Sequence, residues 1–587
     1  MRGIPLEVTS VRAVLRRHLK AITAVIFVLI VVVQATFHML ATSEGRPYES
    51  FDEIATFNNA HVLVGPAADR TYRYGSMDTF LQWAAIVGYN HLTVTGASYR
   101  HIRYANAVTQ SWDDPLLSQR EKTWSGVDYN YFRGVDDRNP IFISRQFHLA
   151  FAYCIILAVG IGFISAFGSR AVYFIVPLLF LTVDPVVYYQ AGQSLPNAIN
   201  ALLTFAIVLL AMVFADRFQD RYLILSAACF AIALNFKADV LVAGGAIGLA
   251  LGLCLVQRGV KLALVSGTWA AFTFGAMFIA TNPFFLAAPG HTLDITYVAM
   301  LNQMSSSPRA GYVSANISFL VQTLDRSFLW EGAGLGLVLA IAVVLFCLIG
   351  AAAKRTPVFG VLAIGAATTL VAWSAIVFRV YNVFDRYWLN GLGAFFATVA
   401  MGLLLAEREG LRNAARATLA VAALVYCVHA TAHARHSFAT YASYKESAGF
   451  SPHHLRTLAS LHAIRTAKEP SYSQTVLVDQ HAYIDLLPFR LAGVDARYVN
   501  MFSLQTVVAN LAPGSKYLVV FGKGDYAPDQ GGKWSPLLMQ AYDAYQAQLA
   551  RYPVLRHYKG RPQRLLSIGP ISFSLDAEMT VAVLSEP

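Results

Sequence analysis

The sequence predicts a polytopic α-helical membrane protein with about eleven transmembrane helices and a C-terminal α/β domain. Of its 587 residues, 56% are hydrophobic and only 13% are charged, whereas soluble domains carry about 25% charged residues. The apolar residues gather in runs close to the roughly 20 residues that a helix needs to cross a bilayer. The last quarter of the chain lacks such runs and alternates short strand-like and helix-like pieces.

The apolar runs are taken in order along the chain. The first follows the basic stretch "RRHLK" (16–20) and exceeds the 7–15 apolar residues of a signal peptide. We therefore expect residues 1–20 to be a cytoplasmic N-terminus and the first run to be an uncleaved anchor. The expected helices cover roughly 21–41, 147–167, 171–190, 197–215, 222–236, 238–256, 262–281, 334–352, 358–378, 388–406 and 415–431.

The connections between these runs agree with the excess of Lys and Arg that cytoplasmic loops carry. Five short connections become cytoplasmic, and each contains Arg or Lys: "GSR" (168–170), "DRFQDR" (216–221), "QRGVK" (257–261), "KRTP" (354–357) and "EREGLRNAAR" (407–416). Three longer polar segments then lie outside, at about 42–146, 282–333 and 432–587. The same rule accounts for the net charge of +11 without nucleic acid as a partner.

The segment 432–587 has the pattern of a soluble α/β domain. Strand-like pieces occur at 475–479, 516–522 and 579–585, and a helix-like stretch at 535–552 separates two of them. We expect this domain to be extracytoplasmic. All the cysteines lie in apolar runs, without the spacing of a zinc site or a disulfide framework: Cys154, Cys229, Cys254, Cys347 and Cys427.

Charged residues gather in the expected outer segments, where they suggest a group-transfer site. The acids Asp52 and Glu53 follow the first helix, and Asp184 lies near the end of the third. The cations Lys237, Arg379 and Arg386 lie in outer turns. Charges near the hydrocarbon boundary are costly and usually pair or serve a site. A carboxylate can take a proton from an acceptor hydroxyl, and cations can stabilise a leaving phosphate.

The order of these features resembles the GT-C superfamily of polyprenyl-phosphate-dependent glycosyltransferases. Relatives include protein O-mannosyltransferases and the aminoarabinose transferase of lipid A. The resemblance covers about residues 20–430. It rests on the Asp52-Glu53 pair, "YRYGSMDTFLQW" (72–83), "AFGSRAVYFIVPLLFL" (166–181), "DPVVYYQ" (184–190), the lysine of "NFKAD" (235–239) and the pair Arg386-Tyr387.

The resemblance implies a site on the outer face within residues 21–431, a lipid-phosphate sugar donor and inversion at the anomeric carbon. It implies that Asp52 is the catalytic base, and we add Glu53 and Asp184 as catalytic candidates. The expected donor-phosphate ligands are Lys237, Arg379 and Arg386. Four tyrosines are expected to line the interface or the donor groove: Tyr72, Tyr74, Tyr188 and Tyr189.

Two departures from the family pattern leave the sugar and the acceptor open. Asn197 stands where many relatives have an acidic residue, and "YGSMD" replaces a Pro-containing pair. These departures weaken a metal-bridged site, so no metal is assigned and a divalent ion stays open. No cofactor is expected. The Gly-rich piece "GAGLGLVLA" (332–340) suits helix packing in a membrane, which disfavours a nucleotide-sugar donor.

Each candidate also has an ordinary structural interpretation. Asp52 and Glu53 can simply solvate a loop, and Asp184 can cap the turn before Pro185. Lys237 can be a snorkelling lysine. Arg386 can anchor the membrane boundary beside an aromatic pair.

The function that the sequence favours is a glycosyltransferase of the bacterial inner membrane. It would move a sugar from a polyprenyl-phosphate carrier to a hydroxyl of a glycan, lipid or protein acceptor. The alternatives are a transporter or flippase of a lipid-linked sugar, and a non-catalytic membrane scaffold. A transporter would more often show paired hydropathy repeats, which this sequence lacks.

Overall fold

The computed structural model describes most of the helical region and the regular elements of the C-terminal segment. The described ranges are 6–42, 140–192, 196–282, 310–327, 334–352, 357–379, 385–446, 472–479, 495–499, 516–522, 536–551, 554–559, 563–568, 571–575 and 578–585, together with 77, 78, 80, 81, 84, 285, 286, 289 and 290. Most of the predicted first outer segment, 42–146, lies outside these residues, and so does the pair Asp52-Glu53.

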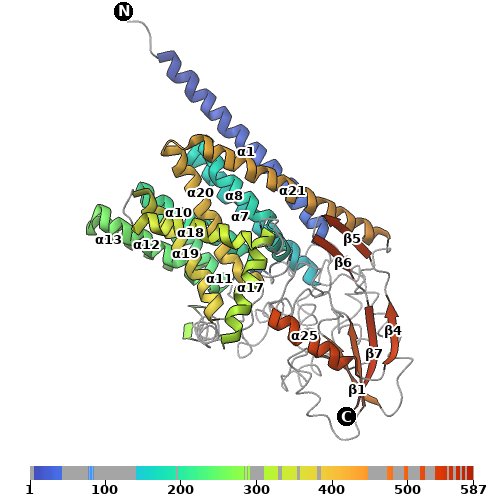
Figure 1. The fold of residues 1–587 in the computed structure, drawn as a ribbon. Coiled ribbons are helices and arrows are strands. Elements are labelled where there is room, and N and C mark those ends of the chain that lie inside the picture. The colour runs from blue at the N-terminus through green and yellow to red at the C-terminus, as the bar shows by residue number, and fades with distance from the viewer. Residues whose placement is uncertain are drawn as a thin grey trace, which may run out of the picture.

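Helical structure is present at each of the predicted apolar runs (Figure 1). The run 171–190, predicted as one helix, is divided into two at Asp184, which has a non-helical backbone before Pro185. The helices are α1 (Leu6–Thr42), α7 (Pro140–Phe167), α8 (Val172–Val183), α9 (Pro185–Ala191), α10 (Asn197–Arg217), α11 (Asp220–Phe236), α12 (Leu241–Arg258), α13 (Val260–Ala280), α17 (Ala310–Ser327), α18 (Leu335–Ala352), α19 (Pro357–Arg379), α20 (Leu389–Arg408) and α21 (Arg412–Glu446). Three short 3-10 helices join them: η2 (Gly168–Ala171), η3 (Ala238–Val240) and η5 (Asp385–Trp388).

The protein is a polytopic helical membrane protein. Within the described residues, 8 stretches are long and apolar enough to cross a membrane. One of them, Arg145–Val183, contains both α7 and α8, which Gly168 separates with a positive φ of 61°. Two further apolar helices in the described part of the chain are too short to be counted: α11, at 17 residues, and the stretch Gly336–Ala351 of α18. The count of eleven crossings therefore stays a prediction.

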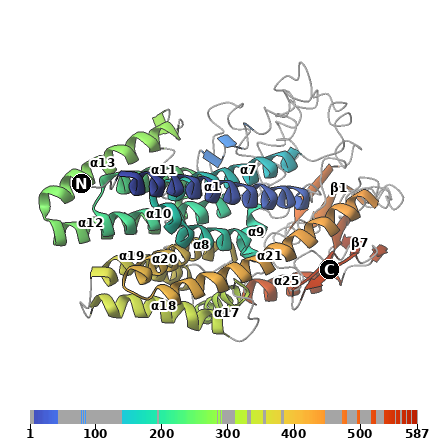
Figure 2. The same ribbon diagram turned by 90° about the horizontal axis from the view of Figure 1, so that it is seen from above.

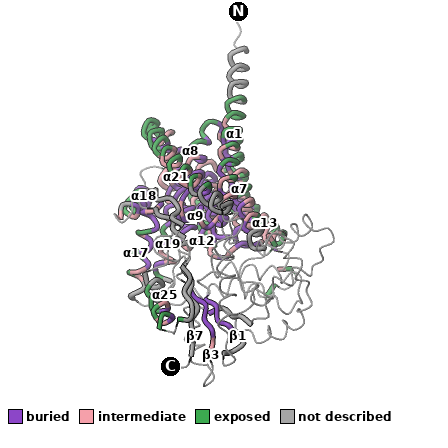
Figure 3. Tube along the Cα trace, turned by 90° about the vertical axis from the view of Figure 1, so that its right-hand side faces the viewer, coloured by how far each residue is buried: buried purple, intermediate pink, exposed green. Residues whose placement is uncertain are grey.

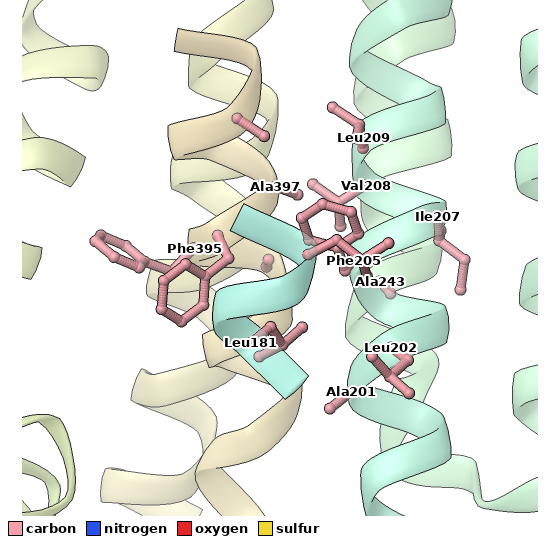
Figure 4. Packing of buried hydrophobic residues seen from close by; sticks show 14 of the residues in the cluster. Leu181, Ala201, Leu202, Phe205, Ile207, Val208, Leu209, Ala243, Phe395 and Ala397 are labelled. Atoms are coloured by element: carbon pink, nitrogen blue, oxygen red, sulfur yellow. The ribbon is translucent and has the colours of Figure 1, made fainter. Parts of the chain in front are cut away.

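Helix α10 forms the centre of the bundle. It is apolar on every side, which is typical of a helix surrounded by protein, and it packs against α11, α12, α19 and α20. Phe205 of α10 is fully buried beside residues of α12 and α20 (Figure 4). Burial is greatest in this centre (Figure 3). By contrast, α13 exposes large apolar side chains such as Phe272, at 68% exposure, as lipid contact requires.

The C-terminal segment contains a five-stranded sheet in the order β2-β1-β3-β7-β4, with β1, β2 and β3 parallel and β7 antiparallel to both of its neighbours. A separate hairpin pairs β5 with β6. The strands are β1 (Tyr472–Asp479), β2 (Asp495–Val499), β3 (Lys516–Gly522), β4 (Val554–Lys559), β5 (Gln563–Ile568), β6 (Ile571–Leu575) and β7 (Glu578–Ser585). Helix α25 (Pro536–Leu549) lies between β3 and β4 in the chain. The predicted strand 516–522 coincides with β3.

The two ends of the bundle differ, and this positions the candidate site. The sheet lies beside one end, here called the sheet end, where α21 contacts β5 and α17 contacts α25 (Figures 1 and 2). Helix α21 runs to Glu446, past its predicted end at about 431. The opposite end, here called the turn end, holds η2 and the turns at 218–219, 259 and 409–411.

Ion pairs join the helices at the turn end. Arg408 contacts Asp216 at 2.7 Å, and Arg170 contacts Glu407 at 3.3 Å. Several of the basic connections that the sequence assigns to the cytoplasm therefore gather at one end of the molecule. Which side of the membrane this end faces stays a prediction.

Candidate functional site

Lys237 lies at the sheet end, directly after α11. Its backbone is extended, with φ −161° and ψ 136°, so that α11 ends here and η3 begins at the next residue. Its Nζ donates to Asn197 Oδ1 at 2.9 Å and contacts Asp239 Oδ2 at 3.0 Å. The side chain is only 13% exposed. Contacts with Asn197 and Asp239 therefore fix the position of the Lys237 ammonium, whereas a snorkelling lysine extends toward water.

A pair of buried amides supports the lysine from one side. Asn197, the first residue of α10, donates its Nδ2 to Gln190 Oε1 of α9 at 2.9 Å. An ammonium group only donates hydrogen bonds, so the Asn197 carbonyl must face Lys237 and the amide nitrogen must face Gln190. The residue that departs from the family pattern thus touches the predicted phosphate ligand. A neutral amide holds Lys237 here without cancelling its charge.

The other side of Lys237 is held by Asp239 and Asn200. Asn200 is fully buried and donates its Nδ2 to the Lys237 carbonyl and to Asp239 Oδ1, both at 3.1 Å. Asn200 Oδ1 accepts no hydrogen bond within the described residues. Asp239 was not predicted as a site residue, although it stands two positions after the lysine in "NFKAD". The sequence feature that could have indicated Asp239 is its negative charge within the same short turn as Lys237.

The short helix η5 brings the predicted "Arg-Tyr" pair beside this network. Lys237 Nζ lies 5.3 Å from the centroid of the Tyr387 ring, within cation–π range. Trp388, which follows, is fully buried, and its carbonyl accepts a hydrogen bond from Trp373 at 3.4 Å. The η5 turn also contacts α9, α10 and α17. The helix η5, which contains Arg386, therefore places its Tyr387 ring beside the Lys237 ammonium.

Two other predicted cations have side chains outside the described set. Arg386 lies within η5, and Arg379 is the last residue of α19. Their placement in the chain suits the predicted phosphate contact. Whether their guanidinium groups reach a phosphate stays a prediction.

Asp184 takes the capping role that was left open from sequence. It is fully buried and caps α9, because its Oδ1 accepts hydrogen bonds from the amides of Val186 at 2.9 Å and Val187 at 3.2 Å. Pro185 occupies the first helical position, as is common at helix N-termini. This cap fixes the start of the helix that carries Gln190. A catalytic role for Asp184 stays a prediction.

Tyr188 lies on α9 between two histidine rings. It stacks on His38 of α1 and on His433 of α21, each at a centroid distance of 3.7 Å. Its hydroxyl lies 3.3 Å from Ser437 Oγ, and His433 Nε2 donates to the Val183 carbonyl at 3.0 Å. Tyr188 is thus a buried packing residue, whereas the next residue, Tyr189, is half-buried. A substrate contact of either tyrosine stays a prediction.

The remaining predicted residues lie outside the described part of the chain. They are Asp52, Glu53, Tyr72 and Tyr74. Sequence reasoning missed a buried pair within the described residues: His148 Nε2 of α7 lies 2.8 Å from Asp78 Oδ1. Both residues are almost fully buried, and so is Arg145 on α7. The available signal was a set of titratable residues at the start of an apolar run, and Asp78 within "YRYGSMDTFLQW".

The described residues offer one anchored cation within a polar network. Such an arrangement can bind an anion through Lys237, with Asn197 and Asp239 controlling its position and charge. Among the described residues, no group of three or more His, Cys, Asp or Glu side chains is arranged to hold a metal ion.

Comparisons with known proteins give one structural likeness. No family model matches the chain. No curated protein matches it either. A crystal structure of ArnT from Cupriavidus metallidurans bound to undecaprenyl phosphate is similar over 95% of this chain and 97% of that chain, with 12% sequence identity and a TM-score of 0.42. A likeness at this level assigns no activity to the present chain.

Proposed function

We propose that this protein is a membrane glycosyltransferase. It moves a sugar from a polyprenyl-phosphate carrier to a hydroxyl of a glycan, lipid or protein acceptor. The observation that carries the proposal is Lys237, which lies at the sheet end of an apolar bundle, held by Asn197 and Asp239 beside the Arg386-Tyr387 turn. The sequence resemblance to polyprenyl-phosphate-dependent transferases supports the same function.

The position of the cation suits a phosphate that is attached to a lipid. A polyprenyl chain requires an apolar environment, and its phosphate requires donors at the membrane boundary. Lysine and arginine supply strong, charge-assisted hydrogen bonds to phosphate oxygens. In this proposal Lys237 and Arg386 bind the donor phosphate, Arg379 adds positive charge, and the hydrocarbon chain lies against the helices.

The proposed reaction is a displacement at the anomeric carbon. Asp52 takes the proton from the acceptor hydroxyl, with Glu53 orienting it. The acceptor oxygen forms a bond to the anomeric carbon from the face opposite the phosphate. The bond between that carbon and the phosphate oxygen breaks, and its electron pair leaves with the phosphate. Lys237 and Arg386 stabilise the charge that develops there, and the configuration inverts.

The proposed location is the bacterial inner membrane, with the sheet end and residues 432–587 extracytoplasmic. The basic turns support this orientation, because short cytoplasmic connections carry an excess of Lys and Arg. The acidic pair that follows α1 would then lie on the same side as Lys237. Donor, acceptor and base would meet outside the cytoplasm.

The test is the envelope glycan profile of a deletion strain, measured by mass spectrometry. The strain is complemented with wild type, Asp52→Asn or Asp216→Asn, and membrane levels of each form are measured. We expect one sugar to be absent in the deletion and in Asp52→Asn, and present with the other two forms. Asp216→Asn is the matched control, because it makes the same change at the turn end. Full restoration by Asp52→Asn would contradict Asp52 as the base.

A further inference from the structure

We infer that Asp239 is an internal counter-ion of Lys237, and that the phosphate of the lipid carrier replaces it when the carrier binds. This inference rests on the proposed function, since it concerns the same phosphate. It assigns roles to Asp239, Asn197 and Gln190, residues that the sequence resemblance leaves without one. The structural basis is that Asn197 and Asp239, which both contact the Lys237 ammonium, differ in charge.

The neutral partner keeps the lysine in place. Asn197 accepts a hydrogen bond from Lys237 at 2.9 Å, and Gln190 accepts one from Asn197 at 2.9 Å. Both amides are at least nine-tenths buried and lie on two different helices, α10 and α9. The ammonium therefore stays at this position when its contact with Asp239 is lost. Asn197 and Gln190 are positioning residues in this scheme.

Asp239, the charged partner, also accepts a hydrogen bond from a second donor, Asn200. Asp239 Oδ2 contacts Lys237 at 3.0 Å, while its Oδ1 accepts a hydrogen bond from Asn200 at 3.1 Å. Asn200 is held by the Lys237 carbonyl at 3.1 Å and does not depend on the lysine side chain. The Asp239 side chain is 25% exposed, so water can solvate the oxygen that loses the lysine. Lys237 can therefore exchange its contact with the Asp239 carboxylate for a contact with a phosphate.

The ion pair between Lys237 and Asp239 affects both the stability of the empty site and its affinity for phosphate. An unpaired ammonium near the hydrocarbon boundary is costly, and pairing with Asp239 reduces that cost while no substrate is bound. The phosphate monoester of the sugar-free carrier brings up to two negative charges and three unesterified oxygens, so it competes well with a carboxylate for the same cation. The sugar-loaded diester brings one charge and two such oxygens, as a carboxylate does. The competition also sets the affinity, because every phosphate that binds must displace Asp239. Removal of the Asp239 charge should then strengthen phosphate binding.

The experiment measures binding of undecaprenyl phosphate to the purified full-length protein in detergent, with undecaprenol as the phosphate-free control. We expect Asp239→Asn to lower the Kd for the phosphate by about threefold or more, and Lys237→Gln to raise it by about tenfold or more. The double variant should bind as weakly as Lys237→Gln alone. Undecaprenol binding should be the same in all forms.

Asp216→Asn is the matched control, since it removes one carboxylate from an ion pair at the turn end. It should leave phosphate binding unchanged. Asp239→Ser provides a second way to remove the charge if the asparagine form does not fold, as judged by size exclusion and melting temperature. Unchanged or weaker binding in the folded Asp239 variant would overturn the inference. Unchanged binding in Lys237→Gln would instead contradict the phosphate role of Lys237 in the proposed function.

Discussion

Tyr188 stacks on His433 with ring centroids 3.7 Å apart and planes 12° from parallel. This contact joins α9 to α21, the helix that leads from the bundle toward the C-terminal sheet. The same short helix carries Gln190, which accepts the hydrogen bond from Asn197 beneath Lys237. A buried aromatic contact thus supports the helix on which the candidate phosphate site rests.

Tyr188→Ala should destabilise the protein by about 3–5 kcal/mol, because it removes a buried aromatic ring and its stacking contacts with His38 and His433. Tyr188→Phe should cost only about 0.5–1.5 kcal/mol, since it retains the stacks and loses one hydrogen bond to Ser437. Thermal unfolding in detergent measures both. Equal losses in the two variants would show that the ring contributes little.

Gly393→Ala should destabilise the contact between α10 and α20 by about 1–3 kcal/mol through overpacking. A Cβ at Gly393 would clash with the Ala201 carbonyl oxygen, and a backbone atom cannot move aside as a side chain can. Gly245→Ala is the control, because a Cβ there meets nothing within 4 Å. That variant should be neutral, or more stable by up to about 1 kcal/mol. Unfolding temperatures that fall equally in both variants would contradict the packing argument.

Asp78→Ala and His148→Ala should each reduce stability by about 1–3 kcal/mol, since each removes one hydrogen bond from a buried polar group. The double variant should lose less than the sum of the two, by about 0.5 kcal/mol or more, because the residues are in contact. A double-mutant cycle on the unfolding free energy in detergent checks this. Strict additivity would mean that the 2.8 Å contact contributes nothing.

Tyr545 should make the stability of the C-terminal sheet region fall at high pH. Its hydroxyl donates to Asp479 Oδ1 at 2.8 Å, and burial, aided by this carboxylate, raises the pKa of Tyr545 well above its usual range. Above about pH 10 the unfolded tyrosine loses its proton while the folded one retains it, so stability falls by up to about 1.4 kcal/mol per pH unit. Below that pH the contribution is fully present.

Tyr545→Phe is the matching variant, because it removes the ionising group from both states. It should be less stable than wild type at neutral pH, by about 1–3 kcal/mol, since Asp479 loses a donor. The difference should narrow as the pH rises above about 10. Melting temperatures of both forms across this range provide the measurement. Parallel curves would contradict the predicted pH effect.

The positions of the helices could be predicted from sequence because apolar runs and basic turns are local properties. The placement of helices at every predicted run and the match of β3 to residues 516–522 follow from this. The exact number of crossings did not follow, since α11 is short and α7 joins α8 through a four-residue turn. Helix length and hydropathy do not determine whether such helices cross the membrane separately.

The sequence by itself determined the membrane class and the helical runs. It also predicted that Lys237 and Arg386 lie on the same side of the membrane, because alternate crossings place their two turns on one side. Only the tertiary structure decided that Asn197 and Asp239 hold the lysine, that Asp184 caps α9, and that Tyr188 lies between two histidines. These contacts join helices that are distant in the chain or depend on side-chain direction. The hydropathy pattern and the residue spacing predict neither kind of contact, because a hydrogen bond depends on where the two groups meet in space.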